Sequence, residues 1–275
     1  WGAIRDVMVS SIPRSFTLSI TSIVVLFLLG FASLLDEGTI AIFNLAFNLQ
    51  SVPLSIVGVS YSLAAFPMLA ALYVKGEKVG FVDKVETAAR HILFWSLPAL
   101  TLFIVLRAQI VRSVLGAGEF GWSATRLTAA TLAILVVSVF AQSLILLFVR
   151  SYYATGNTKK PLLFGVISGA STIILAFILL ISPENTYYFM YFLEALLKVE
   201  GVYGTRMLLL PLAFSVGTLI NLILLFTSFS MDFGRFSEDF WRTTRHAFYT
   251  SVLAGFVTFN SLRFFADVFN TRTVV

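Results

Sequence analysis

Long stretches without charge are the feature that most constrains this chain. The stretch from Gly38 to Val74 contains no Asp, Glu, Lys or Arg, and further apolar runs lie between clusters of charged residues. A helix needs about 20 mostly apolar residues to cross the hydrocarbon core of a bilayer. Barrel strands would be about 10 residues long and would alternate in polarity, which these runs do not. The sequence therefore predicts an all-α fold, a polytopic integral membrane bundle.

Seven transmembrane helices are predicted from these runs. They cover residues 15–35, 38–74, 87–106, 127–149, 161–181, 207–231 and 247–268. Pro53 and Pro67 lie inside the second run, where each removes a helix hydrogen bond and bends the axis. We expect one long, kinked helix there, with a hairpin of two helices as the alternative. The aromatic segment Glu184 to Tyr203 is either a short helix on the membrane surface or an ordinary loop.

The composition favours a membrane protein over a soluble one, and the sequence carries no strong enzyme signature. Only 12% of the residues are charged, against about 25% in soluble domains. Cysteine is absent, which rules out disulfides and thiolate metal sites. The predicted spans contain no paired carboxylates, and the chain has no phosphate-binding glycine loop or nucleophile elbow. We therefore expect no cofactor and no metal ion. We also expect no nucleic-acid partner, because the basic residues form short clusters between spans.

The distribution of basic residues predicts the orientation. With the N-terminus inside, twelve Lys and Arg residues fall in inner segments and seven in outer segments. Cytoplasmic segments are enriched in these residues. The sequence therefore predicts a multi-pass protein of the cytoplasmic membrane whose N-terminus faces the cytoplasm.

Polar residues in the second span form the main candidate site. Asn44, Asn48, Ser51, Ser55 and Ser62 recur at spacings of 4, 3, 4 and 7, which places them on one helical face, and the first four are the candidate path residues. A polar stripe in lipid must face protein or a water-filled cavity. It is either the wall of a substrate path or polar contact between helices, and the sequence favours neither.

Polar sets in the fourth and sixth spans favour helix packing instead. They are Thr131, Ser138 and Gln142, and Ser215, Gly217, Thr218 and Asn221. Arg14 and Arg150 are candidates for the cytoplasmic mouth of the path. Arginine can bind a phosphate, although a basic residue beside a span also serves as a topology signal.

Three segments, in this order and between the appropriate spans, resemble the MurJ/MviN lipid II flippase family. Residues 51–70, SVPLSIVGVSYSLAAFPMLA, carry Pro53, the pair Gly58 and Val59, and Pro67. Residues 115–120, LGAGEF, resemble the glycine-phenylalanine outer loop of the family. Residues 150–161, RSYYATGNTKKP, resemble its inner loop, with Asn157 in place of the usual aspartate. Pro53, Gly58 and Pro67 are accordingly the candidate kinks and hinges.

The resemblance implies an exporter-type fold with two helical lobes around a central cavity. This chain resembles a partial C-terminal lobe, so that an N-terminal lobe would be a missing partner. The implied function is a flippase that moves a lipid-linked saccharide, such as lipid II, across the membrane for peptidoglycan synthesis. The headgroup would pass Asn44, Asn48, Ser51 and Ser55, and the lipid tail would follow a groove with the seventh helix as one wall. Membrane lipids are the other expected partners.

Two departures from the family pattern concern the substrate and its energy source. Phe47, Asn48 and Ser51 stand where the family has an Asp-Arg pair and a nearby acidic residue. The first and fifth spans lack Asp, Glu and Asn, so we expect no sodium site in this lobe. The alternatives are an exporter of another polysaccharide lipid or drug, and a non-transporting scaffold for cell-wall enzymes that uses inner loops such as Lys75 to Arg90.

Overall fold

The computed structural model describes residues 2–115, 121–181 and 183–269, without the side chains of residues 2–14, 18, 115, 183–187 and 266–269. Every regular element within these ranges is helical. The elements are α1 (Gly2–Ala32), α2 (Thr39–Pro53), the π-helix η1 (Leu54–Val59), α3 (Ser60–Val74), α4 (Lys78–Val105), α5 (Arg107–Leu115), α6 (Trp122–Val137), α7 (Val139–Ala154), α8 (Lys159–Ile181), α9 (Pro183–Leu197), the 3-10 helix η2 (Thr205–Leu208), α10 (Leu209–Phe233) and α11 (Glu238–Phe269). The all-α prediction is confirmed.

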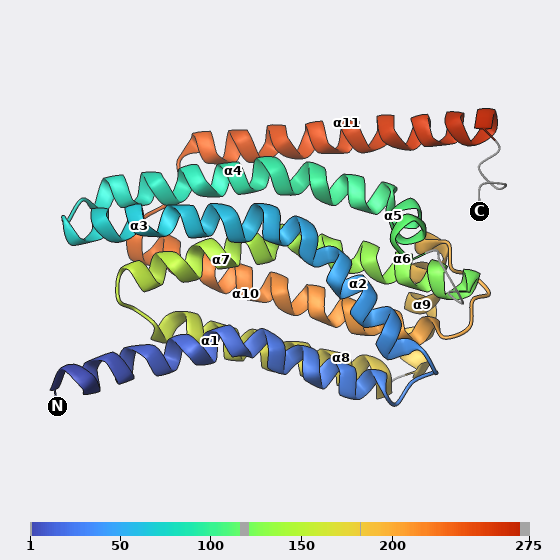
Figure 1. The fold of residues 1–275 in the computed structure, drawn as a ribbon, viewed down its shortest axis with the longest axis horizontal. Helices are drawn as coiled ribbons and strands as arrows, with labels where there is room; N and C mark the ends of the chain where they lie inside the picture. The colour runs from blue at the N-terminus through green and yellow to red at the C-terminus, as the bar shows by residue number, and fades with distance from the viewer. Residues whose placement is uncertain (1, 116–120, 182, 270–275) are drawn as a thin grey trace.

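The long helices run back and forth along one axis (Figure 1). The start of α1 and the α3–α4, α7–α8 and α10–α11 connections lie at one end, called here the N-terminal end. The α1–α2 connection, α5, α9 and the end of α11 lie at the other, called the C-terminal end. The predicted inner segments thus lie together at the N-terminal end.

Six helical runs among the described residues are long and apolar enough to cross a membrane. They are Ser15–Ala32, Thr39–Val74, Lys78–Val105, Trp122–Ala154, Lys159–Ile181 and Thr205–Phe233. The seventh predicted span, 247–268, lies within α11, which packs along α4. Helix α11 is long enough to span a membrane but less apolar than the six runs, because Asn260 and Arg263 interrupt its apolar stretch.

The second run is one bent helix and not a hairpin. Helix α2, η1 and α3 follow one another without a loop, and the ribbon changes direction between α2 and α3 (Figure 1). Pro53 ends α2, immediately before the π-helical turn. Proline lacks the N–H that a regular turn requires, and π-turns are a recognised cause of kinks. Pro67, by contrast, lies inside the regular helix α3.

The fourth run contains a break that the sequence did not predict. Ser138 separates α6 from α7, with φ and ψ of −81° and −11°. Its hydroxyl donates a hydrogen bond to the carbonyl oxygen of Leu135, at 2.7 Å. Helices α6 and α7 nevertheless form the most buried run of the bundle.

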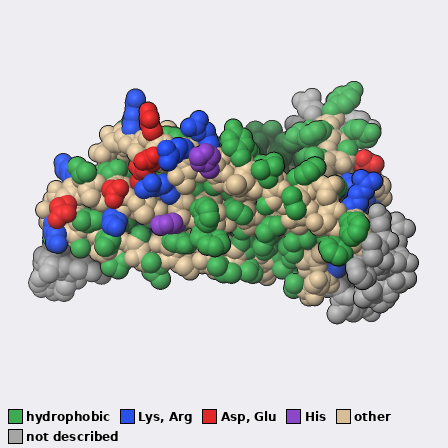
Figure 2. Space-filling model, turned by 90° about the horizontal axis from the view of Figure 1, so that it is seen from above, with side chains coloured by type: hydrophobic (Ala, Val, Ile, Leu, Met, Phe, Trp, Pro, Cys, Tyr) green, Lys and Arg blue, Asp and Glu red, His purple; other side chains and the backbone are tan. Residues whose placement is uncertain are grey.

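Apolar side chains cover the middle of the molecule, and charged ones gather at its ends (Figure 2). Large exposed side chains on the outer helices include Leu26, Ile56, Leu163, Ile174 and Phe256. So many exposed apolar groups match a hydrocarbon solvent and not water. Helix α9 covers most of the Glu184 to Tyr203 segment and lies at the C-terminal end. Residues 116–120 of the LGAGEF segment lie outside the described ranges.

Candidate substrate path

The polar stripe of the second span lies on the outward face of α2. Asn48 and Ser55 are exposed, and Asn44 and Ser51 are half-buried. Ala46, on the opposite face, is completely buried in the core. The structure therefore keeps these four residues together on one surface, and it turns that surface away from the described part of the bundle. Ser62, the fifth residue of the predicted stripe, is instead completely buried in α3, because the π-helical turn η1 shifts the helical register before it.

The stripe does not join α2 to another described helix. The Ser51 hydroxyl donates to the carbonyl oxygen of Asn48 at 2.6 Å, within α2. Within the described residues, the side chains of Asn44 and Asn48 have no hydrogen bond. An amide exposed to hydrocarbon without a partner costs several kcal/mol. Water or another protein surface must therefore cover this face.

Gln50 makes the polar contact between helices that the stripe does not. It is completely buried, and its Oε1 accepts a hydrogen bond from Gln142 Nε2 at 3.2 Å. The same Gln142 nitrogen donates to Ser138 Oγ at 2.8 Å. This network ties α2 to the break between α6 and α7. The packing role suggested for Ser138 and Gln142 agrees with these contacts.

Gly58 lies at the closest approach between η1 and α7. A Cβ atom on Gly58 would lie 2.6 Å from Ser143 Oγ and 2.8 Å from Ser143 Cα. Only glycine lets the two backbones come this close. The candidate hinge residues Pro53 and Gly58 thus lie next to and inside the π-helical turn, while Pro67 is exposed on α3.

Of the two candidate residues for the cytoplasmic mouth, the structure describes the side chain of only one. Arg150 is half-buried near the end of α7, at the N-terminal end of the bundle. Arg14 belongs to α1, but its side chain lies outside the described residues.

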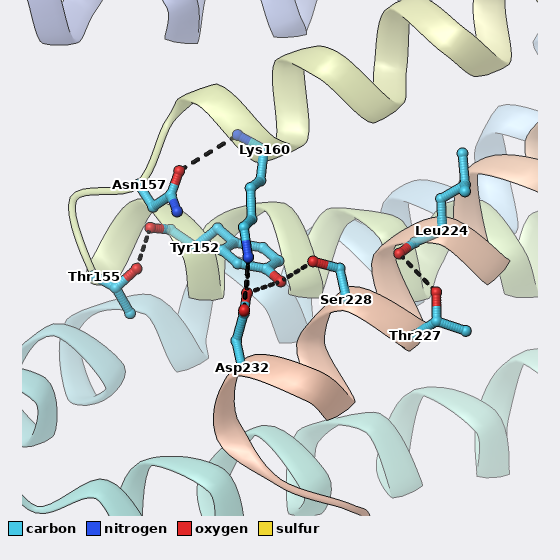
Figure 3. Close-up of polar contacts among 8 residues, drawn as sticks. All are labelled: Tyr152, Thr155, Asn157, Lys160, Leu224, Thr227, Ser228 and Asp232. Carbon is cyan, nitrogen blue, oxygen red and sulfur yellow. Dashed lines mark hydrogen bonds and ion pairs between the residues drawn. The ribbon is translucent and has the colours of Figure 1, made fainter.

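A side-chain cluster that the sequence did not predict joins α7, α8 and α10 (Figure 3). Lys160, at the start of α8, forms an ion pair with Asp232, near the end of α10. The hydroxyl of Tyr152, on α7, lies 2.8 Å from Asp232 Oδ2 and 2.8 Å from Ser228 Oγ. A carboxylate only accepts hydrogen bonds, so the Tyr152 hydroxyl donates a hydrogen bond to Asp232. Asp232 is separated from Lys160 by 72 residues, and no local pattern indicates their pairing.

A cavity of about 280 Å³ lies inside the bundle, between α1, η1, α7, α8 and α10. Its polar lining includes Thr21, Gln142, Thr218 and Asn221, and Asn221 Oδ1 is buried. Amide and hydroxyl groups line it, and no carboxylate is among the lining residues. Nearby, Ser215 Oγ donates to the Ile134 carbonyl oxygen at 2.9 Å, a contact between α10 and α6.

The helical bundle and its apolar girdle define a polytopic helical membrane protein. A sequence profile of the family described as "MurJ: Lipid II flippase MurJ" matches residues 3–271. The chain belongs to the lipid II flippase MurJ family.

Individual relatives agree with this assignment. The chain is 32% identical over 152 residues to the probable lipid II flippase MurJ of Bdellovibrio bacteriovorus, a match to 55% of this chain and 29% of that protein. It is 27% identical over 164 residues to the probable lipid II flippase MurJ of Vibrio cholerae, a match to 60% of this chain and 31% of that protein.

A solved structure gives the same fold. The structure titled "Lipid II flippase MurJ, inward closed conformation" superposes with a TM-score of 0.66 at 21% identity, over 92% of this chain and 53% of that chain. The chain therefore spans about half of the solved structure, and its alignments cover about a third of the curated relatives.

Proposed function

We propose that this chain is one lobe of a flippase that moves a lipid-linked saccharide, of the lipid II type, across the cytoplasmic membrane for peptidoglycan synthesis. The family assignment supports this function. The observation that carries the proposal is the outward polar stripe on α2, which the described part of the chain leaves uncovered. A polar headgroup needs such a surface to cross the hydrocarbon layer, because it cannot shed its hydrogen-bond partners there.

The second lobe would cover this stripe and complete a hydrated path. The correspondence of 92% of this chain to 53% of a MurJ structure supports the lobe assignment. In this arrangement Asn44 and Asn48 offer amide donors and acceptors to the sugar, and Ser51 and Ser55 offer hydroxyl oxygens. Arg150, and Arg14 with it, would attract the diphosphate at the cytoplasmic mouth.

The lipid tail would stay in an apolar groove beside the path. A groove of about 510 Å³ lies between α4, the α6–α7 run and α11. Its walls include Leu97, Phe140 and Phe248, and they are almost wholly apolar. Helix α11 forms one wall of this groove, in keeping with the role that the family resemblance implies for the seventh helix.

The lobe would bend at η1 as the transporter alternates between its two open states. Segments with π-helical geometry are often found at functional sites, and Pro53 leaves the turn one backbone hydrogen bond short. The close contact of Gly58 with Ser143 gives α7 the role of a fixed support. The clustering of Lys and Arg at the N-terminal end supports a cytoplasmic location for that end.

The test is complementation of cells depleted of their own lipid II flippase, with the gene that encodes this chain. The double variant Asn48→Leu with Ser51→Leu should express and insert normally, because neither side chain packs in the core. It should nevertheless fail to support growth and fail to expose lipid II on the outer leaflet.

A matched control changes two hydroxyl residues outside the stripe. Ser171 and Thr227 each donate a hydrogen bond to a carbonyl oxygen of their own helix. The variant Ser171→Leu with Thr227→Leu should keep full activity. Undiminished translocation by the Asn48 and Ser51 variant would remove the stripe from the path.

A second candidate, an exporter of a different polysaccharide lipid or drug, is favoured by one observation. Phe47, Asn48 and Ser51 occupy the positions where the resemblance places an Asp-Arg pair and an acidic residue. The central cation that would contact a diphosphate is therefore missing from α2. Growth rescue by the wild-type gene in flippase-depleted cells would support lipid II, whereas normal membrane insertion without rescue would support the alternative substrate.

A further inference from the structure

A second large cavity lies at the C-terminal end of the bundle. It has a volume of about 810 Å³ and is bounded by α4, α5, α6, α9 and α11. Five basic side chains contribute to its lining. They are Arg107, Arg112, Arg126, Lys198 and Arg263. No Asp or Glu is among its described lining residues. No lining residue belongs to α1, α2 or α3. This basic cavity is therefore separate from the proposed substrate path.

Two of the arginines hold the cavity wall in place. Arg107 donates to the carbonyl oxygens of Ile104, at 3.0 Å, and of Leu197, at 3.3 Å. Arg126 donates to the carbonyl oxygen of Lys198. Each guanidinium has five N–H donors, so these contacts leave donors available. Burial lowers the pKa of Arg107, which indicates that its charge is poorly solvated.

The other three cations are not neutralised by described residues. Arg112 lies over the ring of Trp122, 5.6 Å from its centroid. Arg263 and Lys198 are exposed. Among the described residues the ion pairs are Arg90–Glu86, Lys160–Asp232 and Arg242–Asp239, and none of the five cations takes part in them. Like charges so close together repel one another unless an anion lies between them.

Backbone groups add to the positive potential. Trp122, Thr125 and Arg126, from the first turns of α6, line the cavity. The N-terminus of a helix carries partial positive charge and N–H groups without helical partners. Lys198 adds a further observation, because it takes the left-handed conformation with φ of 57° where glycine is the usual residue. A basic side chain is thus kept at this rim despite the conformational cost.

We propose that the basic cavity binds a phosphate group, presented by the headgroup of an anionic membrane lipid or as a free ion. Arginine pairs with phosphate oxygens through two parallel hydrogen bonds, and Arg112 and Arg263 line the cavity from α5 and α11. Apolar side chains form the remainder of the wall, including Leu196, Phe259 and Leu262. This combination of cations and apolar wall fits a phosphodiester with acyl chains better than a fully hydrated ion.

The clustering of cations is not a consequence of membrane topology alone. Five of the seven basic residues in the predicted outer segments line this one cavity. Blue side chains are visible at the C-terminal end of the molecule, on the right of Figure 2. The positive-inside preference would place such residues at the other end.

The test is a binding titration of the delipidated chain in a neutral detergent. Phosphatidylglycerol and phosphatidylcholine with identical acyl chains are added separately and followed by native mass spectrometry. Inorganic phosphate is titrated in a parallel calorimetric arm. We expect tight, saturable binding of phosphatidylglycerol and much weaker binding of phosphatidylcholine. Saturable binding of inorganic phosphate in the absence of lipid would assign the site to the free ion, within the same proposal.

The decisive variant is Arg112→Gln with Arg263→Gln, since neither side chain donates a hydrogen bond to described residues. It should weaken phosphatidylglycerol binding by a factor of ten or more, roughly the value of one lost charge-assisted contact. Arg112→Lys with Arg263→Lys should retain most of the affinity.

The matched control removes two charges at the opposite end. Arg235→Gln with Arg242→Gln changes exposed residues and alters the net charge equally, so it should bind like the wild type. Equal loss in both variants would show unspecific attraction and overturn the proposal. Equal binding of both lipids by the wild type, with no binding of phosphate, would also overturn it.

Discussion

Replacing Gly58 with alanine should destabilise the lobe at the proposed hinge. The new Cβ atom would lie 2.8 Å from Ser143 Cα and 2.9 Å from Ser143 Cβ. Non-bonded carbon atoms prefer a separation of about 3.5–4.0 Å. The backbones of η1 and α7 must therefore move apart by roughly 1 Å. A rotation of the Ser143 side chain cannot relieve the contact, because Ser143 Cα belongs to the backbone.

The size of the effect follows from two opposing contributions. Overpacking of this kind costs about 1–3 kcal/mol, and the contact with backbone places Gly58 in the upper part of that range. Alanine in a helix is favoured over glycine by about 1 kcal/mol, which offsets part of the cost. The free energy of unfolding should fall by about 1–2 kcal/mol, or roughly 5- to 30-fold in the ratio of folded to unfolded protein.

Thermal melting in detergent, followed by tryptophan fluorescence, measures the change. Gly30→Ala is the matched control, because a Cβ on Gly30 of α1 would meet no atom within 4 Å; this variant should melt at or above the wild-type temperature. Ser143→Gly should rescue Gly58→Ala only in part, since Ser143 Cα remains in place. If Gly58→Ala melts as high as Gly30→Ala, the close approach of η1 and α7 is not what stabilises the bend.

The remaining predictions concern three other contacts and are checked by the same melting assay. A double-mutant cycle with Lys160→Met and Asp232→Asn should give a coupling energy of about 1 kcal/mol or less, because the pair is partly exposed; a coupling of zero would deny that it ties α8 to α10. Lys198→Gly should stabilise the chain by about 1 kcal/mol through relief of the left-handed conformation, while it weakens phosphatidylglycerol binding. Gly217→Ala should destabilise the chain by about 1–3 kcal/mol, since its Cβ would overlap Thr172 Oγ1. Adding Thr172→Ala should recover part of the lost stability. An unchanged melting temperature in both variants would show that α8 and α10 adjust freely.

Features that a single segment determines could be predicted from the sequence, and features that depend on tertiary contacts could not. The Gly38 to Val74 run was correctly predicted as a single bent helix, because Pro53 changes backbone hydrogen bonding wherever it stands. The break at Ser138 was missed. Serine is common within membrane helices, and only its contact with Gln142 from the next turn distinguishes it.

In the candidate site, too, the local feature was predicted and the tertiary one was not. The spacing of Asn44, Asn48, Ser51 and Ser55 placed them correctly on one face, because helical periodicity is a property of the chain itself. Whether that face turns outward or toward α7 depends on which neighbour buries the other side. Gln50 lies in the same run and is completely buried, so polarity alone could not separate the two roles.

The sequence by itself determined the solvent of this protein, the helical class and the positions of its apolar runs, because hydropathy and backbone hydrogen bonding act over a single segment. Tertiary structure alone decided the pairing of Lys160 with Asp232, the contact of Gly58 with Ser143 and the gathering of five cations around one cavity. These contacts join residues that are far apart in the chain. Their distances are set by how whole helices pack, which no local pattern of residues encodes.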